Sequence, residues 1–196
     1  PYVQLLGATK IGVECRVRSY SVVQRSVNTD VGLNVKVAAS VSSPAVLGAE
    51  RIIARSVGGK ALDSSSSLGQ LLNLGTTAPD AGFNYYFASG EVQLTNEEYL
   101  TMLNPTSTAA SVTVTILAQT SISATTSSTI APITLTVAPN SRATLPIRAK
   151  LIASGIQRFG VTVNSNVALA TERIEYFGDG IGSGKYGSTT KPAGTS

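Results

Sequence analysis

Ser111-Val112-Thr113-Val114-Thr115-Ile116-Leu117 is the stretch that most directly predicts the fold. Val112, Val114 and Ile116 fall on one face of an extended chain, and serine or threonine residues fall on the other. A strand with one buried and one exposed face needs this alternation. The stretch therefore predicts a β-strand that covers a core.

The same pattern extends outward along the chain. It predicts strands at Ile133–Val137 and at residues 161–163, 10–17, 19–23 and 33–37. Turn residues at 138–141 precede another strand at 142–147, which predicts either a hairpin or a pair of strands that crosses between sheets. Short helices are expected only at 67–73 and 150–153. Many short strands separated by turns are typical of antiparallel β-sandwiches.

The first part of the chain shares a motif with the second. Ser43-Pro-Ala-Val-Leu-Gly-Ala-Glu50-Arg51-Ile52 returns 122 positions later as Ser165-Asn-Val-Ala-Leu-Ala-Thr-Glu172-Arg173-Ile174. Each copy is followed by a stretch rich in Gly and Ser and then by Thr-Thr-x-Pro. Internal repeats indicate serial modules, which extend a structure without adding new chemistry. We expect an N-terminal β unit at residues 1–80 and a C-terminal β-sandwich unit with a Gly-rich tail at 81–196.

The composition argues against several classes of function. The 196 residues include no His or Trp, one Cys, one Met and 11 acidic residues, so side chains that commonly serve catalysis and metal binding are scarce. The net charge of +4 comes from scattered Lys and Arg residues, which argues against nucleic-acid binding. No apolar stretch is long enough for a transmembrane helix. We therefore expect no enzyme activity, no catalytic residue, no cofactor and no metal site.

The repeated pairs Glu50-Arg51 and Glu172-Arg173 are the most prominent charged candidates. Adjacent residues on a strand point to opposite faces, so the Glu and Arg of one copy cannot pair side by side. We expect each to meet a partner across the sheet in a structural ion pair, in preference to glycosidase-type chemistry with a second carboxylate. A calcium site at Glu97-Glu98 and Asp179 is not favoured, because oxygen ligands at loop spacing are missing.

Aromatic residues gather at Tyr85-Tyr86-Phe87 and at Tyr176-Phe177. Alternation buries one ring of each adjacent pair, so core packing is the preferred interpretation. The alternative is an aromatic surface of Tyr85, Tyr86 and Tyr176 that binds a cell-surface glycan. Such a site would require an exposed aromatic pair beside polar groups.

Several motifs follow one another in the second part of the chain: Tyr86-Phe87-Ala88-Ser89-Gly90, Asn104-Pro105, Pro139-Asn140-Ser141-Arg142 and Glu172-Arg173-Ile174-Glu175-Tyr176. In this order they resemble a bacterial secreted or cell-surface β-sandwich repeat that occurs in tandem arrays. The similarity covers residues 85–192, and Ser89 stands where the family commonly has Glu. The resemblance implies structural roles for Asn104, Pro105, Asn140 and Arg142, and it implies no enzymatic activity.

The first copy of the motif does not lie within a complete repeat unit. Residues 1–78 match only the back half of such a unit, and the opening strands at 86–116 have no earlier counterpart. A half unit leaves strand edges unpaired and a core partly covered. Either the N-terminal strands form a divergent but self-sufficient sandwich, or a segment of a neighbouring subunit completes the first unit.

These features predict an all-β protein of two tandem Ig-like antiparallel β-sandwich units, of which the first is either self-sufficient or incomplete and completed by a neighbouring subunit. We expect a structural subunit of an extracellular filament or surface layer, secreted or held at the cell surface. It would self-assemble head-to-tail, and β-strand complementation is the route of assembly if the first unit is incomplete. The alternative function is that of a surface adhesion or glycan-binding module.

Overall fold

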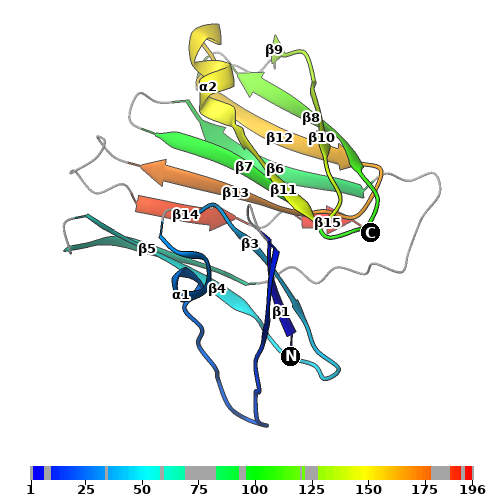
Figure 1. Cartoon of the computed structure of the whole chain (residues 1–196). Coiled ribbons are helices and arrows are strands. Elements are labelled where there is room, and N and C mark those ends of the chain that lie inside the picture. Colours follow the sequence, from blue (N-terminus) through cyan, green and yellow to red (C-terminus); the bar gives the residue numbers. More distant parts are fainter. Residues whose placement is uncertain are drawn as a thin grey trace.

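The computed structural model describes residues 2–6, 10–33, 35–57, 60–68, 83–92, 96–119, 121, 128–177, 186–190 and 193–195. These residues form antiparallel sheets with few and short helices (Figure 1). The predicted all-β class is therefore confirmed. None of the helices within these ranges has the length and apolar character that crossing a membrane requires.

The C-terminal region, which we define as the described residues from 83 to 195, contains two sheets. One sheet has the strand order β10-β8-β12-β6-β15, with β9 also paired to β8, and the other has the order β11-β7-β13-β14. The strands are β6 (Phe83–Glu91), β7 (Glu97–Asn104), β8 (Ala110–Gln119), β9 (Ser128–Thr129), β10 (Ile133–Val137), β11 (Ser141–Pro146), β12 (Arg158–Ser165), β13 (Ala170–Phe177), β14 (Tyr186–Thr190) and β15 (Ala193–Thr195). A short helix α2 (Ile147–Leu151) and the 3-10 turn η1 (Ile152–Ser154) connect β11 to β12.

The core of the C-terminal region fills the space between its two sheets. Val112, Val114 and Ile116 of β8 are all at most 1 % exposed, as their alternation predicts. They pack in one cluster with side chains of β6, β7 and β12, which include Phe87, Met102 and the other buried apolar residues of these strands. The strands on either side of 138–141 belong to different sheets, so the pair that crosses between sheets is the correct alternative for this turn.

The N-terminal region, defined as the described residues from 2 to 68, also contains two sheets. Its elements are β1 (Tyr2–Leu6), β2 (Lys10–Glu14), α1 (Val27–Val31), β3 (Ala38–Ser42), β4 (Glu50–Val57) and β5 (Lys60–Leu68). One sheet has the order β2-β1-β3, and β4 pairs with β5. Strand β5 lies next to β14, which brings the two regions together (Figure 1).

Some local predictions for the N-terminal region are wrong. Residues 19–23 form a turn and an irregular segment instead of a strand, and the strand expected at 33–37 begins only at Ala38. The helix expected at 67–73 is contradicted at its start, because Ser67 and Leu68 end β5, while residues 69–73 lie outside the described ranges. The helix predicted at 150–153 is present as the end of α2 and the turn η1.

The two regions share an order of elements at the spacing of the repeated motif. A shift of 122 positions places β2 on β10, α1 on α2 and η1, β3 on β12, β4 on β13, and β5 on β14. The pairing agrees as well: β1 lies between β2 and β3 as β8 lies between β10 and β12, and β4 pairs with β5 as β13 pairs with β14. The repeat seen in the sequence is thus also a repeat of structure.

Candidate functional site

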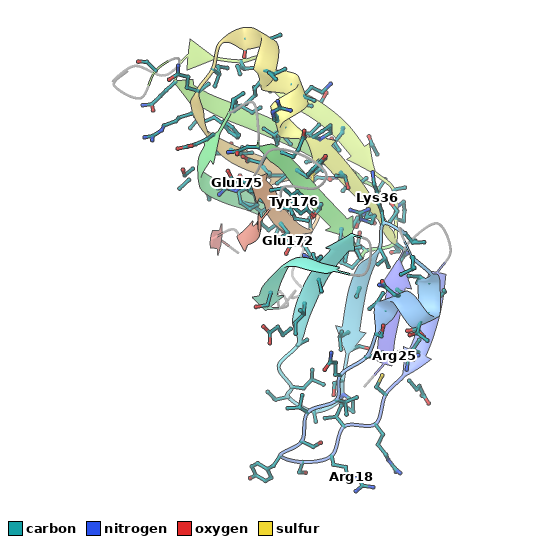
Figure 2. All side chains as sticks on the ribbon, turned by 90° about the vertical axis from the view of Figure 1, so that its left-hand side faces the viewer. Arg18, Arg25, Lys36, Glu172, Glu175 and Tyr176 are labelled. Atoms are coloured by element: carbon teal, nitrogen blue, oxygen red, sulfur yellow. The ribbon has the colours of Figure 1, made fainter. Side chains whose placement is uncertain are left out.

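The repeated pair Glu172-Arg173 lies in β13, and its two side chains point to opposite faces of the sheet. Glu172 faces outward and accepts a hydrogen bond from the guanidinium of Arg51, which belongs to the first copy of the motif. Arg173 faces inward and is 8 % exposed. The prediction that Glu and Arg of one copy do not pair side by side is confirmed, and the outward Glu172 instead joins the two regions. Figure 2 shows Glu172, Glu175 and Tyr176 together on this strand.

Arg173 is the centre of an ionic cluster inside the sandwich. Its Nε lies 3.9 Å from Oε1 of Glu98, and its second terminal nitrogen lies 3.6 Å from Oε2 of Glu175. Glu98 is 1 % exposed, and burial raises its pKa to about 8, although Arg173 opposes this shift and Glu175 adds to it. Burial also raises the pKa of Glu175. The cluster places two carboxyl groups beside one guanidinium, and all three side chains are buried.

Gly90 makes room for this cluster. A Cβ atom at this position would lie 2.5 Å from Cζ of Phe159 and 2.9 Å from Oε2 of Glu98. Both distances are shorter than van der Waals contact, so a larger residue would displace the ring or the carboxylate. The glycine of the Tyr-Phe-Ala-x-Gly motif therefore belongs to the same packing unit as the Glu-Arg motif.

Asn104 fixes a corner of the sandwich at the end of β7. Its side-chain nitrogen donates to the carbonyls of Thr108, Val137 and Ala138 at 2.8, 3.0 and 3.2 Å. Its oxygen accepts from the backbone nitrogen and the hydroxyl of Thr106. The side chain is completely buried, and Pro105 follows where the chain leaves the strand. Asn104 thus ties β7 to the end of β10.

Asn140 and Arg142 shape the next turn. Asn140 adopts a left-handed backbone with φ 49°, which asparagine tolerates better than most residues, and its backbone nitrogen donates to the carbonyl of Thr106. Arg142 donates to the hydroxyl of Thr144 at 2.7 Å. Burial, and to a smaller extent the nearby Arg51, lowers the pKa of Arg142. Both motif residues therefore act in local structure within the chain.

The aromatic residues do not form one surface. Tyr85 is buried, so its assignment to an aromatic surface is wrong: its hydroxyl donates to the carbonyl of Leu169 and accepts from the backbone nitrogen of Leu169. Tyr86 is half exposed on the opposite face of β6. Tyr176 lies in the other sheet, edge-on to Tyr99 with ring centroids 6.1 Å apart. Alternation explains why Tyr85 and Tyr86 separate.

Sequence reasoning missed Glu98, Glu175 and Tyr99 as members of these clusters. The signal for Glu98 was present, because Glu98, Leu100, Met102 and Asn104 occupy alternate positions of one strand and all are buried. The sequence offers no equivalent signal for the edge-on contact of Tyr99 and Tyr176, since it depends on the register between β7 and β13.

Within the described part of the chain, no group of three or more Cys, Asp or Glu residues could hold a metal ion. Glu97 bonds to Arg148 at 3.0 Å and Glu98 points into the core, while Asp179 lies outside the described residues. An open hollow of about 440 Å³ lies in the N-terminal region and is lined by residues 14–17.

Comparison with known proteins gives little further information. No family model and no curated protein matches the chain. A solved structure described as "Crystal Structure of Thermotoga maritima 1070" is 15 % identical with a TM-score of 0.46, over 58 % of this chain and 94 % of that chain. The Anabaena sensory rhodopsin transducer is 18 % identical with a TM-score of 0.36, over 46 % of this chain and 92 % of that chain. These TM-scores are too low to establish a shared fold.

Proposed function

We propose that this chain is a structural subunit of an extracellular or cell-surface assembly, built from two tandem sandwich-like units and joined to a neighbouring subunit through its N-terminal region. The observation that carries this proposal is the distribution of exposed apolar side chains. Among the described residues, ten of the thirteen large hydrophobic side chains that are exposed belong to the N-terminal region. Val22 and Val46, for example, are 95 % and 106 % exposed.

The apolar side chains of the N-terminal region have little core of their own. Among the residues of the N-terminal region whose side-chain burial is described, Leu5 is the one buried hydrophobic residue, whereas the main core cluster draws all its described members from the C-terminal region. Burial of apolar surface contributes roughly 25 cal/mol for each Å² removed from water. Exposed apolar surface concentrated in one region therefore favours association there.

The motif residues support a structural role as well. Gly90, Asn104, Asn140, Glu172 and Arg173 each have a packing, ionic or hydrogen-bonding partner within the chain. Residues selected for ligand binding more commonly converge on a shared concave surface. Here the motif residues stabilise turns, a corner of the sandwich and the contact between the two regions. Such roles are expected of a structural subunit.

Self-association of the purified chain tests this function. Sedimentation velocity over a concentration series and electron microscopy should show head-to-tail oligomers or filaments. Val41→Lys, on β3, should shift the distribution at least tenfold in concentration toward monomers. Leu117→Lys is the matched control, because Leu117 is similarly exposed but lies in the C-terminal region, and it should leave assembly unchanged. A chain that stays monomeric at all concentrations would contradict the proposal.

One observation favours an adhesive or glycan-binding function as the second candidate. The Tyr99–Tyr176 pair lies on the outer face of its sheet beside the ion pair of Glu97 and Arg148. Partly exposed rings next to polar groups are suited to stacking against a sugar. A glycan array probed with the chain and with Tyr99→Ala would test this candidate. Binding that Tyr99→Ala abolishes and Tyr86→Ala preserves would support it.

A further inference from the structure

The N-terminal region lacks counterparts for two strands of the C-terminal region. In the C-terminal region β6 pairs with β12, and β7 lies between β13 and β11. No described strand takes these places beside β3 or on the free side of β4, where the counterparts of β6 and β7 would lie. With respect to the described strands, these two places are sheet edges, and an edge presents backbone donors and acceptors to another strand.

A third segment of the N-terminal region fits this picture. Residues 19–24 are the counterpart of β11, which pairs only with β7 in the C-terminal region. Without such a partner, residues 19–24 form a turn and an irregular segment although their sequence predicts a strand. The absence of one strand thus explains both the open side of β4 and the failure of residues 19–24 to form a strand.

Side chains 122 positions apart in the two regions differ in burial. This difference is expected if the N-terminal region lacks the counterparts of β6 and β7. Leu47 and Leu169 occupy the same position of the repeated motif, yet Leu47 is 36 % exposed and Leu169 is completely buried. Leu169 is held in place by the hydroxyl of Tyr85, which comes from β6. Val41 is likewise exposed, whereas its counterpart Val163 is completely buried opposite β6.

The charged residues Arg51 and Arg173 also indicate that a strand of the β7 pattern fits beside β4. Arg51 is the counterpart of Arg173, whose carboxylate partner Glu98 comes from β7. In the N-terminal region Arg51 turns to Glu172 of the other region, and its Nε is buried without a hydrogen-bond partner. A strand with the pattern of β7 would bring a carboxylate to the inner side of β4.

We infer that the N-terminal region is an acceptor for a β-hairpin of the β6–β7 pattern carried by a partner chain, an inference that goes beyond the self-association proposed above. The hairpin would pair with β3 through its first strand. Its second strand would lie between β4 and residues 19–24, and residues 19–24 would become a strand. Its inward positions would carry large apolar residues and one carboxylate, as Tyr85, Leu100 and Glu98 do in the C-terminal region.

The hairpin that is already folded into the C-terminal region of a second copy does not serve as this donor while that region stays closed. Leu100 and Met102 are at most 1 % exposed there, so removing β7 would uncover the main core. The donor is therefore an additional hairpin of the same pattern.

A fusion tests the inference on the full chain. Residues 83–109, which comprise the hairpin and its own connection to the next strand, are joined in front of Tyr2, because β1 occupies the place of β8. Hydrogen exchange should then slow at least tenfold at residues 19–24 and 38–41, and binding of a dye specific for exposed apolar surface should fall severalfold. The control fusion carries Leu100→Asp and Met102→Asp in the added copy only, and it should retain the exchange rates of the parent chain. Equal exchange at residues 19–24 in both fusions would overturn the inference.

A peptide of residues 83–104 added to the unfused chain separates this inference from the proposed function. If the peptide protects residues 19–24 while the chain alone stays monomeric, the acceptor exists and the proposed self-assembly fails. If the chain assembles but neither the peptide nor the fusion protects residues 19–24, assembly stands and the acceptor inference fails. Assembly without protection of residues 19–24 would be observed, for example, if two copies associated edge to edge through β3.

Discussion

The N-terminal and C-terminal regions share a series of elements, from β2 to β5 in one and from β10 to β14 in the other, and their described side chains differ in burial. Leu169 is buried while Leu47, the same residue of the same motif, is exposed. Local sequence therefore does not decide the burial of this leucine, since both copies carry it. What differs is the pair β6 and β7, whose side chains close the sandwich in the C-terminal region.

The largest expected contrast between the regions comes from removing apolar side chains. Met102 is completely buried in the core cluster, so Met102→Ala should lower the free energy of unfolding by about 2–5 kcal/mol. Val46→Ala in the N-terminal region should change it by less than about 0.5 kcal/mol, because Val46 is fully exposed. Urea denaturation of dilute protein measures both. Similar losses for the two variants would mean that the N-terminal region has a core of its own.

A second contrast concerns two glycines. Gly90→Ala should cost about 1–3 kcal/mol, because the added methyl group would meet Phe159 and Glu98. Gly48→Ala should have little effect, since nothing lies within 4 Å of the position that its Cβ would take. Thermal unfolding of the two variants checks this difference. An unchanged midpoint for Gly90→Ala would show that the ionic cluster is loosely packed.

A third prediction uses pH to test the buried cluster of the C-terminal region. The pKa of Glu98 rises from 4.5 in its ordinary state to about 8 in the folded chain. Between these values the folded chain holds a proton that the unfolded chain releases, so stability falls as the pH rises through this window. The slope would be at most about 1.4 kcal/mol per pH unit for this group. The raised pKa of Glu175 acts in the same direction.

Urea midpoints measured from pH 5 to pH 8 would give this slope. Glu98→Gln should flatten it, because the titrating group is removed. Glu97→Gln is the control, since Glu97 points to the outer face and pairs with Arg148. A steep slope that persists in Glu98→Gln would assign the effect to other groups.

The smallest expected effect is that of the ion pair between the regions. Arg51 and Glu172 are both partly exposed, and such pairs contribute at most about 1 kcal/mol. A double-mutant cycle with Arg51→Ala and Glu172→Gln should therefore give a coupling energy below this value. A larger coupling energy would indicate that the two regions unfold cooperatively and not independently.

The sequence predicts the strands of the C-terminal region well because their alternation continues along each buried face. Val112, Val114 and Ile116 show this, and so does Glu98, whose place in the same alternation reveals a buried carboxylate. The sequence fails at residues 19–23, where a strand pattern is present but no described strand lies beside it. Pairing between distant segments is a property of the fold, and a local pattern contains no information about a missing partner.

The candidate residues divide in the same way. The opposite orientation of Glu172 and Arg173 follows from alternation alone and could be predicted. Their partners could not, because Arg51 reaches Glu172 only through the contact between the regions, and Glu98 reaches Arg173 only through the register of β7 with β13. The burial of Tyr85 was also predictable from alternation, but the two hydrogen bonds of its hydroxyl to Leu169 depend on the turn before β13.

Strand β1 lies in the middle of its sheet, with antiparallel neighbours on both sides. Hydrogen bonds between antiparallel strands run perpendicular to the strand direction. A mechanical pull along β1 would therefore load two ladders in shear at once, and their bonds would share the force and break together. Under such a pull, this strand would act as a mechanical clamp within the sheet of β2, β1 and β3.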